Sequence, residues 1–124
     1  MKLLIMILNR VDLLETLLLA LTNTHIRGAT ILDSHGMAHT LHSYPTQNDN
    51  ASAFLGSIRT MLNPEREKSK TIMIVLREDQ VSVVEEVANR VLGGLDKPDT
   101  GFIFTVPVDY IKGIQLNKEE IKSL

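Results

Sequence analysis

Apolar residues fall along the chain in two alternating patterns, continuous runs and helical stripes. Residues 3–8 and 71–76 are apolar at nearly every position, which predicts strands with both faces shielded from water. Residues 29–34 and 101–108 predict two further strands, the last ending near Pro107. Apolar positions at helical spacing predict helices over 11–22 (Leu14, Leu17, Leu18, Leu21) and 80–92 (Val81, Val84, Val87, Ala88, Val91), the second capped by Asp79 and stopped by Gly93-Gly94.

The order of these elements is strand–helix–strand, a long connection, then strand–helix–strand. Two right-handed crossovers place both helices on one face of a four-stranded antiparallel sheet, so the sequence predicts an α+β, ferredoxin-like βαββαβ fold. The first and third strands are then central. Because both are apolar on the face away from the helices too, a lone chain would expose a large apolar patch. The simplest cover is another copy of the chain, which predicts a cyclic homo-oligomer.

The connection over residues 37–69 is long for so small a domain, and such loops are often functional. It holds a polar, turn-rich stretch at 44–50 and apolar residues at helical spacing over 54–62, which predict a short helix. We therefore expect one domain over residues 1–114, with the loop inserted between the second and third strands. Residues 115–124 form a C-terminal extension, where Asn117 could cap a last short helix.

Composition narrows the function classes for this chain of 124 residues and 13.9 kDa. A net charge of −2 and 4% aromatic residues disfavour a nucleic-acid surface, which needs cations and stacking rings. The absence of cysteine excludes disulfides and thiolate chemistry, and it fits a reducing compartment. The apolar N-terminal run is too short to span a bilayer and lacks a cleavage site, so we expect a cytoplasmic protein without membrane insertion.

Two clusters could carry chemistry. His35, His39 and His42 have the spacing H-x3-H-x2-H, which could hold Zn or Cu, although polar residues lining a cleft would look the same. The stretch from Asp96 to Gly101 could aim backbone N–H groups at an anion, with Lys97 adding a positive charge; a plain connecting loop explains it equally well.

Enzymatic function is disfavoured by the lack of a catalytic dyad. Nothing in the sequence brings Asp33 and Asp109 together as acid and base. Ser34 and His35 are adjacent in a strand, so their side chains point to opposite faces. We therefore expect a binding or regulatory protein.

The segment 26–37, IRGATILDSHGM, resembles the second strand of PII signalling proteins, which has the pattern G-x-T-V-x-E-x-x-G-F. The first strand and helix also match that family, and residues 93–104 resemble its loop T-G-x-x-G-D-G-K-I-F at Gly101, Ile103 and Phe104. The ending Val106-Pro107-Val108-Asp109 is close to that of the cyclic-di-AMP receptors, which share the plan with the CutA proteins. The similarity runs over nearly all of residues 1–114.

The resemblance implies a homotrimer that binds a small effector, such as an adenine nucleotide, in clefts between subunits. The loop 37–69 would report the ligand state to a partner, an enzyme or a membrane transporter. The residues implied to contact the ligand are Gly36, Met37, His39, Lys97, Gly101 and Lys112. Phe102 stands where the family has a Lys, and Gly113 and Gln115 where it has Arg, so a ligand less charged than a triphosphate is expected.

The sequence leaves two functions open. One is a PII-like trimeric regulator, for which no cofactor is assigned beyond a possible adenine nucleotide. The other is a CutA-like metal-binding trimer that uses the histidine cluster.

Overall fold

The computed structural model describes residues 1–37, 40 and 68–113. The strands are β1 (Lys2–Leu8), β2 (Thr30–His35), β3 (Lys68–Leu76) and β4 (Gly101–Pro107). A 3-10 turn, η1 (Val11–Leu13), leads into helix α1 (Leu14–Asn23), and helix α4 (Glu78–Leu92) joins β3 to β4. The predicted short helices at 54–62 and 118–123, together with His39 and His42, lie outside the described residues.

The four strands form one antiparallel sheet in the order β2-β3-β1-β4, so the predicted central position of the first and third strands is confirmed. β1 pairs with β3 from Lys2 opposite Leu76 to Leu8 opposite Lys70. On its other side, β1 pairs with β4 from Lys2 opposite Pro107 to Leu8 opposite Gly101. The element order and topology are compatible with the ferredoxin-like plan.

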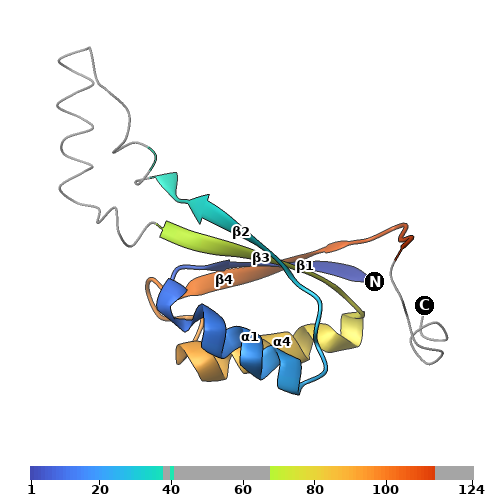
Figure 1. Cartoon of the computed structure of the whole chain (residues 1–124), viewed down its shortest axis with the longest axis horizontal. Helices are drawn as coiled ribbons and strands as arrows, with labels where there is room; N and C mark the ends of the chain where they lie inside the picture. The colour runs from blue at the N-terminus through green and yellow to red at the C-terminus, as the bar shows by residue number, and fades with distance from the viewer. Residues whose placement is uncertain (38–39, 41–67, 114–124) are drawn as a thin grey trace, which may run out of the picture.

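Both helices cover the same face of the sheet, as predicted (Figure 1). Alternate residues of the central strands point into this layer because successive strand side chains face opposite ways. The helices supply the predicted stripes. The buried core comprises Leu4, Met6, Leu8, Leu17, Leu21, Ile26, Ile72, Ile74, Leu76, Val84, Val87, Ala88 and Leu92.

The start of α4 corrects one prediction. The helix begins at Glu78 with Arg77 at the N-cap position, so Asp79 lies within the first turn and does not cap it. The Gln80 side chain reaches back and accepts a hydrogen bond from the Arg77 backbone N–H at 2.8 Å. This bond satisfies an N–H at the helix end. The helix thus begins two residues earlier in the chain than the sequence predicts. The predicted stop is confirmed, because Gly93 has φ +77°.

β3 begins three residues earlier than the sequence predicts, so Lys68 and Ser69 belong to the sheet and not to the long connection. Polar pairs across β2 and β3 explain the difference. Asp33 lies opposite Lys70, and Ser34 lies opposite Ser69. Such cross-strand pairs stabilise a strand that hydrophobicity alone does not reveal.

The sheet face turned away from the helices is apolar, and no described helix packs on it. We call it the open face. The strand register assigns to it Leu3, Ile5, Ile7, Leu32, Met73, Val75, Phe102, Phe104 and Val106. Phe102 remains 55% exposed and Phe104 43% exposed. The predicted second apolar surface of the sheet is therefore present.

Candidate functional site

The loop between α4 and β4 is fixed against the end of β1. Thr100 is buried, and its carbonyl oxygen accepts hydrogen bonds from the backbone N–H groups of Asn9 at 3.1 Å and Arg10 at 3.5 Å. The Thr100 hydroxyl donates to the Lys97 carbonyl oxygen at 2.9 Å. These bonds hold the loop in one shape, so its residues have defined positions for a ligand or for a structural task.

Lys97 lies in this loop with an exposed side chain. A Cβ atom built on Gly93 would be 3.5 Å from the Lys97 Nζ atom, so the ammonium group lies beside the C-terminal end of α4. A cation is favourable there because the helix dipole is negative at that end. Asp96 and Asp99 flank Lys97 in sequence, so the positive charge of this loop is outnumbered by carboxylates.

Gly101 has a structural reason to be glycine. Its φ is +145°, and a Cβ atom there would lie 2.3 Å from the Ile7 carbonyl oxygen. Only a residue without a side chain allows β4 to approach β1 this closely at the start of the strand. The predicted ligand residue is thus also required by the sheet.

The second group of predicted ligand residues follows β2. Met37 is 79% exposed, and Gly36 accepts hydrogen bonds at its carbonyl oxygen from the Thr40 N–H at 3.1 Å and the Thr40 hydroxyl at 3.0 Å. Nearby, the Lys70 ammonium donates to the Asp33 carboxylate. This hydrogen bond, with the charge of Lys70, lowers the pKa of Asp33 below its ordinary value.

The structure places these two groups at the same end of the sheet but on opposite edges. Gly36 and Met37 follow β2, while Lys97 and Gly101 lie at the start of β4, and β3 and β1 separate the two edge strands. Three strand spacings amount to about 14 Å. One chain therefore does not bring them together. Lys112 follows the opposite end of β4, where the Val108 N–H donates to the Met1 carbonyl oxygen.

The proposed histidine cluster is described only at His35, which is exposed at the end of β2. Among the described residues, no group of three His, Asp or Glu side chains could hold a metal ion. Within the same residues, no helix has both the length and the hydrophobicity needed to cross a bilayer.

Two features at the sheet were missed by sequence reasoning. The first is a cluster of hydroxyl groups on the open face, formed by Ser34, Ser69 and Thr71. The Ser34 and Ser69 hydroxyl oxygens are 2.6 Å apart, and the Thr71 hydroxyl donates to the Ser34 hydroxyl oxygen at 2.9 Å. Phe102 and Phe104 stack, with ring centroids 6.1 Å apart. Both features depend on which strands pair and on which residues share a face of the sheet. The alternate positions of the two phenylalanines within 101–107 are the sequence signal that could have indicated their stacking.

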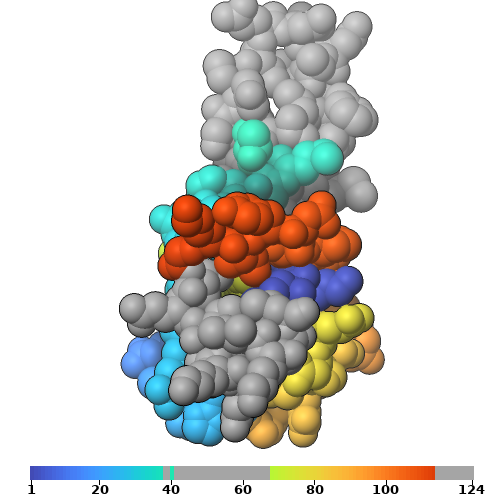
Figure 2. Space-filling view, turned by 90° about the vertical axis from the view of Figure 1, so that its right-hand side faces the viewer, coloured from blue at the N-terminus to red at the C-terminus, as the bar shows by residue number. Residues whose placement is uncertain are grey.

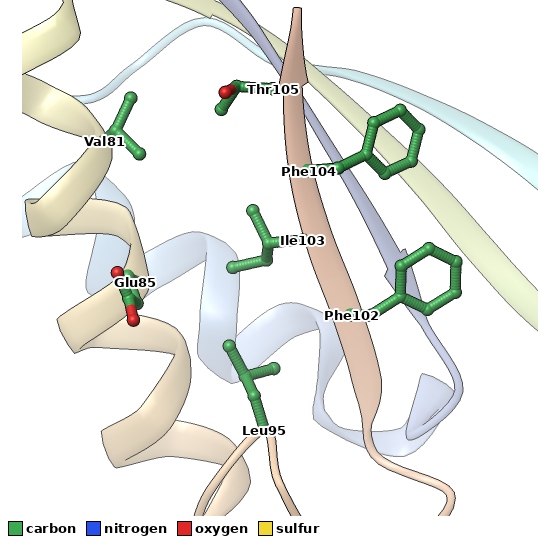
Figure 3. Close-up of a pocket in the computed structure, with 7 residues that line it drawn as sticks. All are labelled: Val81, Glu85, Leu95, Phe102, Ile103, Phe104 and Thr105. Carbon is green, nitrogen blue, oxygen red and sulfur yellow. The ribbon is translucent and has the colours of Figure 1, made fainter.

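A pocket of about 400 Å³ lies on the helix side of β4. Figure 3 shows Val81 and Glu85 of α4 and Leu95 of the following loop facing Ile103 and Thr105 across this space. The rings of Phe102 and Phe104 point away from it, to the other side of the strand. β4 therefore separates an apolar pocket that contains one carboxylate from the open face.

No model of a known protein family matches this chain, and no curated protein matches it significantly.

Proposed function

We propose that the protein is a PII-like homotrimeric regulator that binds a small effector between subunits and acts on a partner protein through the segment between β2 and β3. The single observation that carries the proposal is the open face. Nine apolar side chains gather there. Five of them are each at least 39% exposed in one chain: Leu32, Val75, Phe102, Phe104 and Val106. A surface of this kind is typical of an interface between protein chains.

The separation of the two candidate ligand groups further supports a site shared between chains. In a ring of identical copies, the β2 edge of one chain can approach the β4 edge of the next. The residues Gly36 and Met37 of one copy and Lys97 and Gly101 of its neighbour would then line one cleft. With three copies, three equivalent clefts result.

The weak positive charge around Lys97 favours a ligand with little net negative charge. Lys70 is paired with Asp33, and Arg10 is paired with Asp12 at 2.9 Å, so neither is available without breaking an ion pair. A triphosphate would need more cations than these residues supply. An adenine nucleotide or derivative with few charges, such as AMP or a cyclic dinucleotide, is the effector class we propose.

Control of the partner would follow from differential affinity. An effector that binds one arrangement of the segment after β2 more tightly than another shifts the population toward that arrangement. Met37, at the start of this segment, is one of the residues that we expect to line the proposed cleft.

The test is a thermal-shift screen of the full chain with AMP, ADP, ATP, cyclic dinucleotides and divalent metals. A ligand that binds only the folded protein stabilises it by about 2.7 kcal/mol at 100 times its Kd. We expect one nucleotide of low charge to raise Tm, and Lys97→Ala to weaken that response. The matched control is Arg90→Ala, which removes an exposed cation from the last turn of α4 that is not among the predicted ligand residues. No response to any nucleotide would refute the proposal, and a response to metals alone would favour the CutA-like alternative.

A further inference from the structure

The pocket beside α4 exists because α4 leaves part of β4 uncovered. Within the described chain, the buried core residues come from β1, β3, the two helices and the segment after α1, and none comes from β4. Figure 2 looks along the layers, with β4 (orange-red) above the start of β1 (dark blue) and the first turns of α4 (yellow) lower down. Three apolar side chains remain half-buried around the pocket of about 400 Å³: Val81, Leu95 and Ile103. A space of this size is within the range of small-molecule sites.

Two polar side chains join these apolar walls, Glu85 with its carboxylate and Thr105 with its hydroxyl (Figure 3). Glu85 follows Val81 by one helical turn, so both side chains lie on the face of α4 that borders the pocket. Among the described residues, neither Glu85 nor Thr105 has an ion-pair or hydrogen-bond partner for its side chain. The cation that precedes α4, Arg77, is already paired with Asp79 at 3.0 Å. The described chain therefore leaves the negative charge of the pocket without a counter-ion.

We propose that this pocket binds a small organic amine, a ligand with an apolar body and a protonated amino group. The apolar body would fill the space among Val81, Leu95 and Ile103 and complete their burial. The ammonium group would donate to the Glu85 carboxylate, because hydrogen bonds between two charged groups are the stronger kind. The Thr105 hydroxyl is available for one further hydrogen bond with a polar group of the ligand.

The lining of the pocket disfavours other classes of ligand. An anion would meet the Glu85 carboxylate without a cation to offset the repulsion, which disfavours a nucleotide here. A quaternary ammonium ion prefers aromatic faces, whereas the rings of Phe102 and Phe104 point to the other side of the strand. A metal ion needs several carboxylate or imidazole ligands, and the lining contains one carboxylate and no histidine. A primary or secondary amine is the cation that this set of groups fits.

The amine site goes beyond the proposed function and does not compete with it. A ligand in the pocket contacts side chains on the helix side of β4, so the backbone edge of that strand stays available to a neighbouring copy. The effector of the proposed function is expected at Lys97 and Gly101 instead, in the loop before β4. The two ligands therefore differ both in charge and in the residues that receive them.

Titration of the full chain with phenethylamine tests the proposal, with phenethyl alcohol and hydrocinnamate as neutral and anionic analogues of similar shape. Amide chemical shifts in NMR spectra locate the ligand and give its Kd. We expect the amine to shift the amides of Ile103 and Thr105 with a Kd of about 1 mM or below, as is usual for so small a ligand. It should bind at least about tenfold more tightly than either analogue. Unchanged amides at about 10 mM amine, or equally tight binding of the alcohol, would overturn the proposal.

A pair of variants tests the role of the carboxylate. Glu85→Gln keeps the size of the side chain and removes its charge, so it should weaken amine binding at least about tenfold and leave the binding of phenethyl alcohol unchanged. Glu86→Gln is the matched control, because Glu86 is the next residue of α4, is exposed and is not part of the pocket lining. An equal loss in the two variants would indicate a general attraction to an acidic helix and would overturn the proposal. Neither a trimer nor a nucleotide enters these measurements, so failure here is distinguishable from failure of the proposed function.

Discussion

A lysine placed on the open face tests the assembly on which the proposed function depends. Phe104 lies opposite Ile5 of β1, near the middle of β4, and keeps 43% of its surface exposed in one chain. Because that position is already partly exposed, Phe104→Lys should leave the folded chain intact. In a trimer that covers the open face, the same change removes an apolar contact from each copy and introduces a buried charge.

The magnitude follows from the exposed area. An aromatic side chain buries about 200 Å² when fully covered, so the exposed 43% of Phe104 corresponds to about 85 Å². At about 25 cal/mol per Å², each copy loses about 2 kcal/mol and a trimer about 6 kcal/mol. This loss weakens the association constant by about 10⁴-fold, before the cost of burying the ammonium group is added.

Size-exclusion chromatography with light scattering measures the oligomeric state at chain concentrations of about 1–100 μM. An about 10⁴-fold weaker association is visible in this range for typical affinities. Leu19→Lys is the matched control, because Leu19 is an apolar residue of α1 with 60% exposure and lies away from the sheet. We expect the wild type and Leu19→Lys to run as trimers and Phe104→Lys as a monomer with an unchanged circular dichroism spectrum. A monomeric wild type, or a trimer that persists in Phe104→Lys, would refute the reasoning.

Three further predictions concern stability. Gly101→Ala should destabilise the fold by at least about 2 kcal/mol in urea unfolding, because its Cβ atom would meet a carbonyl oxygen of β1 at 2.3 Å, whereas Gly28→Ala, with nothing within 4 Å, should change little; equal effects would contradict the close-approach argument. Asp33→Asn should remove a small stabilisation that is present above the ordinary pKa of 3.8 and is lost as pH falls through the lowered pKa of Asp33. The free energies of unfolding of wild type and variant, measured in urea, should therefore converge in acid, whereas a variant that acts through packing should keep its difference. The same convergence should appear for Lys70→Ala. Val84→Ala should cost about 1–3 kcal/mol by leaving a cavity in the core, and a smaller loss would mean that α4 repacks.

The sequence was sufficient for the layers of the fold because hydrophobic periodicity reports burial directly. The run at 3–8 is apolar on both parities, and β1 indeed has Leu4 buried against the helices and Ile5 on the open face. The stripe of α4 was equally direct, since Val84 and Val87 are both buried. In each case, the local pattern and the tertiary environment agree.

The positions that the sequence did not reveal depend on partners distant in the chain. Lys68 and Ser69 read as loop residues because their strand character comes from pairing with His35 and Ser34. Arg77 gave no capping signal, since the bond at the start of α4 is made by its backbone and the side chain of Gln80. Hydrophobic patterns in a single sequence do not report such hydrogen bonds or strand pairings.

The candidate site was harder to predict for the same reason. Gly36 and Lys97 were grouped by resemblance, whereas the strand order places them on opposite edges of one sheet. Gly101 illustrates a second difficulty, because close packing against β1 already requires glycine there. A residue type can therefore satisfy a structural demand and resemble a ligand motif at the same position.

Side-chain parity along β4 separates the open face, on which the proposed assembly depends, from the pocket beside α4. The side chains of Phe102, Phe104 and Val106 lie on the open face, and the backbone groups of these residues point to β1. Ile103 and Thr105 direct their side chains to the pocket beside α4 and their backbone groups to the edge of the sheet away from β1. A polar substitution at Phe102, Phe104 or Val106 should thus disturb assembly, and one at Ile103 should instead disturb packing against α4. Because adjacent residues report on different surfaces, the oligomeric state and the exchange rates of β4 amides can change independently. A variant at Phe104 that exposed the amides of Ile103 and Thr105 without changing the oligomeric state would show that the two surfaces are not separate.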